Sequence, residues 1–285
     1  MTQLSALRAQ IAERLSKTSQ TADLDAQVLL AHILDKPRAW LAAHPEALLT
    51  QPQLASLEEA VSRLEAGQPL PYVLGRWQFY GLEFEVTPDV LIPRPETELL
   101  VERGIAWLRA FPHRRTVADI GTGSGAIAIA IALHVPDVHI LATDISSAAL
   151  EVAKRNAQKF NLHNRIEFCE CDLLPSPSSS VEPSSFDLIC ANLPYIPSAT
   201  LRTLPVYGRE PALALDGGAD GLETIRRLLA LAPARLSPGG MMLLEIEASQ
   251  GLAVLSLAYD HFHAAKISLS KDLAGCDRLL QIQLL

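Results

Sequence analysis

Hydrophobic residues recur at helical spacing from the start of the chain to residue 65. Three apolar stripes, over residues 4–15, 24–34 and 54–64, repeat every three or four positions, which is the period of an amphipathic helix. Prolines lie between the stripes, where they end or interrupt helices. The pattern predicts a helical bundle with its own packed core, which we place at residues 1–70.

The pattern changes after residue 70. The segment is rich in aromatic and β-branched residues, Gly75 and Gly81 mark turns, and apolar residues alternate with glutamates around Phe84. Alternation with a period of two predicts a β-strand. We therefore assign residues 71–95 to a β-hairpin linker between two domains.

Two prolines make the sequence LIPRPETE, at residues 91–98, stiff and extended. Its charged residues Arg94, Glu96 and Glu98 are candidates to point into a site. Residue chemistry alone favours a simpler interpretation, a rigid linker followed by a helix that begins near Glu96.

From residue 116 onward, short apolar runs alternate with helical patterns. Such runs are typical of buried strands, and their alternation with helices predicts an α/β fold with a mostly parallel sheet covered on both faces. The run 175–185, rich in serine and proline, predicts a flexible surface loop. The predicted strands are 117–120, 139–143, 166–169, 187–191 and 241–246, with edge strands at 264–269 and 278–284, one of them antiparallel; the predicted helices are 125–134, 147–160 and 222–236.

Composition narrows the classes of function. Of the 285 residues, 49% are hydrophobic and 20% are charged, as in ordinary globular proteins, and the formal net charge is −8. This balance argues against tight non-specific binding to nucleic acid, which depends on lysine and arginine meeting phosphates. The four cysteines form no CxxC pair and the histidines form no metal-binding pattern, so we expect reduced thiols and no metal. No apolar stretch is long enough to cross a bilayer, which predicts a cytoplasmic protein without a membrane partner.

A glycine-rich sequence, DIGTGSG at residues 119–125, follows the first predicted strand and opens a helix. Glycines at such a place let the backbone turn sharply and let a ligand approach closely. The pattern also fits dinucleotide-binding enzymes, so it does not identify the ligand. The residues that we assign to cofactor binding are Gly121, Thr122, Gly123, Ser124 and Gly125.

Two acidic residues follow the next two strands. Asp144 lies about 20 residues beyond the glycines, where a carboxylate accepts hydrogen bonds from ribose hydroxyls; alternatively, it begins the next helix. Asp172 is placed to read an adenine amino group, with Leu173 packed on the ring, although an ordinary loop acid fits equally well. At this point NAD and S-adenosylmethionine remain alternatives.

The tetrapeptide Asn192-Leu193-Pro194-Tyr195 directly follows the fourth predicted strand, at the carboxyl edge of the sheet, where open α/β sheets bind ligands. The Asn192 side-chain carbonyl and the Leu193 backbone carbonyl can each accept one N–H of a planar NH2 group, which orients the nitrogen lone pair toward a sulfonium methyl. Pro194 fixes the backbone, and Tyr195 can stack on the flat group and support a cationic transition state. The alternative is an ordinary strand-end turn, but beside the glycine loop and Asp144 methyl transfer is favoured.

These features resemble the PrmC/HemK enzymes, which methylate the side-chain amide of a glutamine in peptide chain release factors. The likeness covers nearly the whole chain and is weakest at residues 1–65. Its most specific part is LIPRPETE followed by an Asn-x-Pro-Tyr motif. It also rests on PYVLGRWQFYGLEFEV, REPALALDGGADGL, SPGGMMLLEI and KDLAGCDR.

The resemblance implies a Rossmann-like, seven-stranded methyltransferase domain at residues 96–285 and an N-terminal helical domain that helps to recognise a release factor. We expect a monomer with no direct contact to nucleic acid. The family usually has proline at position 193, but leucine supplies the same backbone carbonyl, so activity is expected with a less rigid loop. By resemblance, S-adenosylmethionine contacts residues 121–125, Asp144, Asp172, Leu173 and Asn192; the substrate glutamine, read within Gly-Gly-Gln, contacts Asn192, Leu193, Pro194 and Tyr195; and Arg94 and Glu98 line the pocket.

Three other functions are alternatives to this one. A DNA or RNA methyltransferase acting on the adenine amine would also use a planar NH2, but it has to extract a base and hold a phosphate backbone, which a net charge of −8 disfavours. A nicotinamide dehydrogenase would share the glycine loop and have no use for the tetrapeptide. A non-catalytic binding module would not need Asn192, Pro194 and Tyr195.

Overall fold

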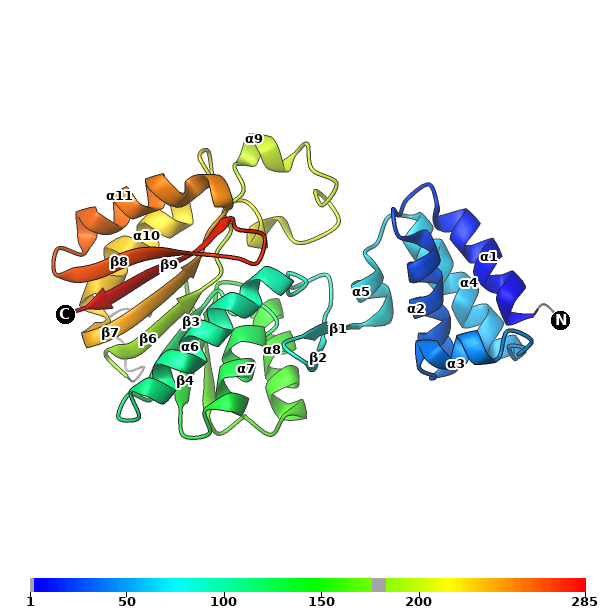
Figure 1. Cartoon of the computed structure of the whole chain (residues 1–285), viewed down its shortest axis with the longest axis horizontal. Helices are drawn as coiled ribbons and strands as arrows, with labels where there is room; N and C mark the ends of the chain where they lie inside the picture. Colours follow the sequence, from blue (N-terminus) through cyan, green and yellow to red (C-terminus); the bar gives the residue numbers. More distant parts are fainter. Residues whose placement is uncertain (1–2, 176–182) are drawn as a thin grey trace. The chain divides into compact units, whose positions relative to one another are not determined.

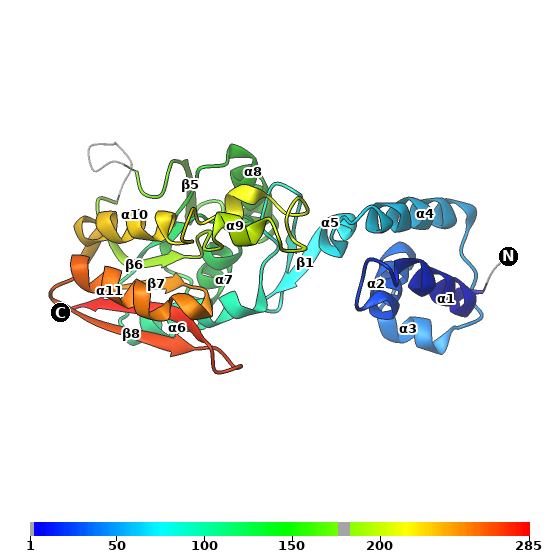
Figure 2. The ribbon, with the colours of Figure 1, turned by 90° about the horizontal axis from the view of Figure 1, so that it is seen from above.

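The chain forms two compact units, residues 1–76 and residues 77–285. The computed structural model describes residues 3–175 and 183–285, and Figures 1 and 2 show it in two views. Most of the loop that the sequence predicts at 175–185 therefore lies outside the described residues. Within the described ranges, every helix is too short or too polar to span a membrane.

The first unit is helical, as its apolar stripes predict. The stripes face one another and bury a core of leucines together with Ile11 and Val61. Helix α4 begins with a capping box at Thr50, and Arg14 of α1 forms ion pairs with Glu58 and Glu65 of α4. The helices are α1 (Leu4–Leu15), α2 (Ala22–Leu34), α3 (Arg38–Ala43), α4 (Gln51–Glu65) and α5 (Leu70–Leu74).

A two-stranded sheet confirms the predicted hairpin. Strands β1 (Arg76–Phe79) and β2 (Leu82–Glu85) are joined by Tyr80 and Gly81, whose φ angles are 52° and 71°. Positive φ at both residues suits the two-residue turns that match the twist of paired strands. The rigid segment then leads into η1 (Pro95–Thr97) and α6 (Glu98–Ala110), a helix start close to the predicted one.

A seven-stranded sheet organises the second unit and confirms the predicted fold class. Its order is β5-β4-β3-β6-β7-β9-β8, and only β9 runs against the other strands, because it pairs antiparallel with both β7 and β8. The strands are β3 (Thr116–Ile120), β4 (His139–Asp144), β5 (Ile166–Glu170), β6 (Phe186–Ala191), β7 (Leu236–Glu245), β8 (Ala265–Lys271) and β9 (Asp277–Leu284).

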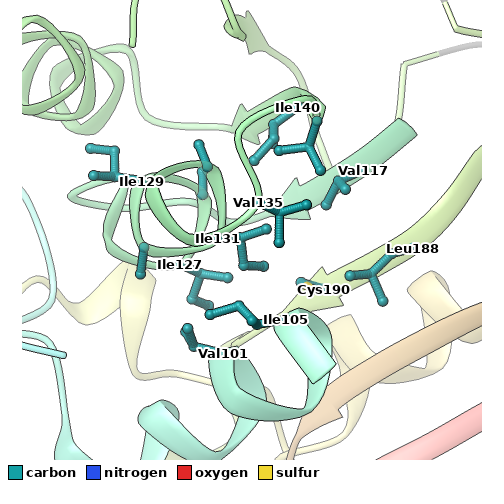
Figure 3. Close-up of a cluster of buried hydrophobic side chains, with 14 of the residues drawn as sticks. Val101, Ile105, Val117, Ile127, Ile129, Ile131, Val135, Ile140, Leu188 and Cys190 are labelled. Atoms are coloured by element: carbon teal, nitrogen blue, oxygen red, sulfur yellow. The ribbon is translucent and has the colours of Figure 1, made fainter. Parts of the chain in front are cut away.

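Helices cover both faces of this sheet (Figures 1 and 2). Consecutive strand residues point to opposite faces, so Val117 joins the core beneath α6 and α7, whereas Ala118 joins the core beneath α10 and α11. Figure 3 shows part of the first core, to which Ile105 of α6, Ile131 of α7 and Leu188 of β6 all belong. The helices after α6 are α7 (Ala126–His134), α8 (Ser147–Lys159), α9 (Ser198–Leu201), α10 (Glu223–Leu231) and α11 (Gly251–His261), of which α9 and α11 were not predicted; short turns η2 (Ala212–Ala214), η3 (Ala232–Ala234) and η4 (Ala248–Gln250) complete them.

One buried side chain joins the hairpin to the Rossmann-like sheet. Asn156 of α8 is fully buried, and its Oδ1 accepts the Glu85 N–H at 2.7 Å. Its Nδ2 donates to the Glu85 carbonyl at 3.0 Å and to the Ser124 carbonyl at 2.9 Å. The amide thereby holds β2, α8 and the glycine-rich loop together.

Replacing Asn156 by alanine is therefore expected to lower the free energy of unfolding by about 2–4 kcal/mol, because three buried hydrogen bonds are lost and their partners stay buried. Urea unfolding followed by circular dichroism measures the change. Gln158→Ala, at an exposed position of the same helix, is the matched control and should unfold like the wild type. Equal stability of the two variants would contradict this role of Asn156.

Candidate active site

Five neighbouring strands each bring one functional segment to the same edge of the sheet. In the order β5, β4, β3, β6 and β7, their carboxyl ends lead to residues 171–173, Asp144, the glycine loop, the tetrapeptide at 192–195 and Glu245. A cavity of about 390 Å³ lies there, lined by residues of the first four of these segments and by parts of residues 88–97 and 211–216. This is the size of a small-molecule site, at the place where parallel sheets bind ligands.

The glycine loop after β3 is open toward the cavity. Gly121, Gly123 and Gly125 have φ angles of 69°, 55° and 80°, in the region that favours glycine. A Cβ at Gly123 would meet nothing within 4 Å, whereas one at Gly125 would lie 3.3 Å from Ala153 Cβ. The loop thus exposes backbone to a ligand at its centre and packs closely on α8 at its end. Thr122 and Ser124 also line the cavity.

Beneath the loop lies Asp119, which is completely buried at the end of β3. Burial raises the pKa of its carboxyl to about 6, although hydrogen bonds from the Thr122 hydroxyl at 2.6 Å and the Ala128 N–H at 3.1 Å oppose this shift. Asp119 therefore fixes the shape of the glycine loop from inside the protein.

Asp144 lies just before the start of α8, as one of its two suggested roles requires, and its carboxylate also reaches the glycine loop. Its Oδ1 accepts the Ser146 N–H at 2.9 Å at the start of α8, and its Oδ2 accepts the Gly123 N–H at 2.9 Å across the cavity edge. Burial raises the pKa of the Asp144 carboxyl, and the backbone N–H groups of Ser146, Gly123 and Ile145 partly offset this shift. The carboxylate lines the cavity with acceptor capacity left for a hydroxyl.

Asp172 and Leu173 form the far wall beyond β5. The Asp172 carboxylate is half-exposed and forms an ion pair with Arg227 of α10, which also lines the cavity. Leu173 is 6% exposed and has a φ of 65°, and its carbonyl accepts the Thr143 hydroxyl at 2.6 Å. An arginine therefore holds Asp172 at the cavity rim, which the sequence did not indicate.

In the tetrapeptide, Asn192 Nδ2 donates to the Thr97 hydroxyl at 3.0 Å. No hydrogen bond among the described residues uses Asn192 Oδ1 or the Leu193 carbonyl. Asn192, Leu193 and Pro194 line the cavity. The two acceptors needed for a planar NH2 group are thus left available beside the glycine loop.

Tyr195 is placed differently from the rest of the tetrapeptide. It is not among the cavity-lining residues of the described chain, and its hydroxyl lies 3.5 Å from Glu245 Oε1. Burial and the nearby Glu245 charge raise the pKa of the Tyr195 phenol to about 12. Its backbone carbonyl accepts Gln250 Nε2 at 2.9 Å, so the residue is held from both ends.

Arg94 and Glu98 have different surroundings in the structure, and only Arg94 lines the cavity. Arg94 lines the cavity and binds Glu210 Oε1 at 2.5 Å; the Glu210 side chain is 5% exposed and its Oε2 accepts the Ile92 N–H. Glu98 is absent from the described cavity lining, and its carboxylate accepts the Tyr80 N–H at 2.8 Å. Arg94 is therefore at the cavity, whereas Glu98 supports the hairpin turn.

Comparison with known proteins decides the family. The sequence matches the PrmC N-terminal domain over residues 6–75 and a methyltransferase domain over residues 113–245. The release factor glutamine methyltransferase of Moorella thermoacetica is 43% identical over 90% of this chain and 89% of its own length. The chain belongs to the release factor glutamine methyltransferase family. The Coxiella burnetii member is 39% identical over 95% of both chains.

Solved structures of other methyltransferases share the fold of this family member. The catalytic domain of human METTL16, in complex with an RNA hairpin, superposes with a TM-score of 0.56 at 16% identity, covering 90% of this chain and 91% of its own. The N-terminal domain of human METTL16 in complex with SAH gives 0.53 at 17% identity, over 90% and 93%. At these identities the likeness establishes the Rossmann-like methyltransferase fold alone.

Proposed function

We propose that this chain uses S-adenosylmethionine to methylate the side-chain amide nitrogen of the glutamine in the Gly-Gly-Gln motif of peptide chain release factors. The observation that carries the proposal is Asn192, whose NH2 group is bound to Thr97 while its Oδ1 and the adjacent Leu193 carbonyl stay unused. The shared name of the relatives, release factor glutamine methyltransferase, supports the choice of substrate.

One observation supports a fit between the cavity and this cofactor. A Cβ at Gly123 would meet nothing within 4 Å, so there is open space at the centre of the glycine loop, and Asp144 lines the same cavity. We propose that Gly121–Gly125 hold the amino acid end, that Asp144 accepts the ribose hydroxyls, and that Asp172 and Leu173 hold the adenine. When bound, the cofactor would supply an electrophilic sulfonium methyl group, whose bond to sulfur breaks on transfer, and leave as S-adenosylhomocysteine.

The residues of the chain would orient the acceptor. Asn192 Oδ1 accepts one N–H of the glutamine amide and the Leu193 carbonyl accepts the other, so the nitrogen lone pair is turned toward the methyl donor. The hydrogen bonds to both acceptors become stronger as positive charge develops on the substrate nitrogen. The nitrogen gains the methyl group and loses one amide proton to water, and because the alkylated nitrogen is acidic, no strong base is required. Pro194 restricts the loop, and Tyr195 supports it from behind.

The remaining proposals concern recognition. We propose that residues 1–70 form the domain that recognises the release factor, that 71–95 act as the linker, and that 96–285 are the catalytic domain. Arg94, which is held by Glu210, would line the entrance through which the Gly-Gly-Gln segment reaches the cavity. Glu98 would support this entrance indirectly, by holding the hairpin turn. We further propose a monomer that acts in the cytoplasm, where translation terminates, without direct contact to nucleic acid.

The test is to incubate the protein with methyl-labelled S-adenosylmethionine and a bacterial release factor and to map the label by mass spectrometry. We expect one methyl group on the glutamine of Gly-Gly-Gln and none when that glutamine is replaced by alanine. Duplex DNA and RNA are offered in parallel reactions. Labelled adenine with an unlabelled release factor would overturn the proposal in favour of a nucleic acid methyltransferase.

A further inference from the structure

Glu245, at the end of β7, is a buried carboxylate in an otherwise apolar run, and it is 1% exposed. Its Oε1 lies 3.5 Å from the Tyr195 hydroxyl. Its Oε2 is buried and has no partner with full hydrogen-bond geometry in the described part of the chain. Burying a carboxylate in this way costs free energy, so a residue of this kind calls for a functional explanation.

Thr97 connects this carboxylate to the tetrapeptide. Its hydroxyl oxygen accepts Asn192 Nδ2 at 3.0 Å, and its hydrogen bonding lowers the pKa of Glu245. A hydroxyl has a single proton to donate. Because the Thr97 oxygen accepts from Asn192, that proton remains available for the buried Glu245 carboxylate, whose Oε2 has no hydrogen-bond partner among the described residues. We refer to Asn192, Thr97 and Glu245 together as the donor chain.

We propose that Thr97 and Glu245 are positioning residues for methyl transfer, which hold the Asn192 amide with its oxygen toward the substrate. Glu245 is only an acceptor when ionised, so Thr97 has to donate to it and accept from Asn192. With the amide turned the other way, Asn192 would present an NH2 group to the substrate NH2 group, and no hydrogen bond that orients the nitrogen could form. This proposal rests on the proposed function and extends it to two residues outside the tetrapeptide.

The ionisation of Glu245 is expected to make methyl transfer depend on pH. Burial raises the pKa of its carboxyl to about 7; hydrogen bonds from Thr97 and Tyr195 and the Arg278 charge on β9 oppose the shift, whereas Glu96 on η1 adds to it. Above this pH the carboxylate is ionised, fixes the direction of the donor chain and favours positive charge on the substrate nitrogen. Methyl transfer should therefore become faster as the pH rises through about 7.

Two variants of Thr97 separate positioning from packing. Thr97→Val keeps the shape and removes the hydroxyl, and we expect kcat to fall about 30-fold while KM and the Kd for S-adenosylmethionine stay within about threefold. Thr97→Ser keeps the hydroxyl and should restore most of the loss. Thermal unfolding shows whether each variant is folded. A normal kcat in Thr97→Val, or an equal loss in Thr97→Ser, would overturn the proposal.

The pH profile tests Glu245 directly. In the wild type, kcat should rise through pH values near 7, and in Glu245→Gln, which keeps an acceptor oxygen but has no ionisable group, the rise should be absent. A rise that persists unchanged in Glu245→Gln would assign it to another group and refute the effect of charge.

A readout without substrate keeps this proposal separate from the proposed function. In ¹⁵N-labelled protein, the Asn192 side-chain NH2 signal is assigned by its loss in Asn192→Ala. We expect that signal to be shifted and slow to exchange in the wild type and in Thr97→Ser, and to move toward the position of a free amide in Thr97→Val. If release factors are not methylated but this pattern is seen, the positioning stands and the substrate is wrong; an unchanged signal in Thr97→Val would refute the positioning.

Discussion

Replacing Asn192 by alanine is expected to lower kcat for release-factor methylation by about 10³-fold, the upper range for losing one preorganised group at a reacting centre. The variant loses the Oδ1 acceptor and with it the orientation of the glutamine nitrogen. The Kd for S-adenosylmethionine should rise by no more than about threefold, because the glycine loop and Asp144 are unchanged. Single-turnover kinetics and calorimetry measure the two quantities.

The matched control for this variant is Asn164→Ala, at an exposed position outside the cavity lining. It should methylate release factor at the wild-type rate. An Asn192→Ala variant that loses cofactor affinity as strongly as kcat would instead make Asn192 mainly a cofactor contact.

Replacing Gly217 by alanine is the second change expected to have a large effect. Gly217 is 22 residues beyond Tyr195, yet its N–H donates to the Ile196 carbonyl at 2.9 Å. A Cβ there would lie 2.8 Å from the Pro194 carbonyl oxygen and 2.8 Å from Tyr195 Cα. Both are backbone atoms of the tetrapeptide, so the substrate loop itself would have to move.

We expect Gly217→Ala to lower kcat/KM by about 100-fold or more and the free energy of unfolding by about 2–3 kcal/mol, because displacement of a catalytic group by 1 Å is costly and the site cannot relax around backbone. Gly208→Ala is the control: it adds a methyl group where nothing lies within 4 Å, although its φ of 74° makes it slightly strained. Its activity should stay near that of the wild type. Full activity in Gly217→Ala would show that the loop tolerates displacement.

Periodicity was sufficient to predict the sheet and its functional edge. Buried parallel strands appear as continuous apolar runs, and all seven were located to within a few residues; the largest error was the start of β7, at Leu236 rather than Met241, because Pro238 and two glycines interrupt its apolar pattern. Helix α11 was missed because its sequence, GLAVLSLAYDH, has weak amphipathic contrast. Local sequence patterns are thus sufficient to predict most of this fold.

The site was only partly predictable, because its support is not local. The cofactor and substrate segments each follow a strand, and that position can be read from sequence. The donor chain joins Thr97, Asn192 and Glu245, which are 95 and 53 residues apart in sequence, and no short motif reports such contacts. One signal was present: Glu245 is a lone acid in an apolar strand, which is unusual unless the carboxylate is used. Arg227 gave no such signal, and Gly217 was marked only as part of the segment REPALALDGGADGL, on which the resemblance partly rests.

Leu193, at a position where the resemblance to the family predicts proline, packs against the glycine loop. It is 3% exposed, and its Cδ2 lies 3.1 Å from where a Cβ at Gly121 would be. A larger residue at position 121 would thus collide with leucine, and proline at position 193 would leave the space over Gly121 less filled. In evolutionary terms we therefore expect the two positions to be epistatic: a substitution at Gly121, already disfavoured by its positive φ, should be tolerated to an extent that depends on the residue at position 193.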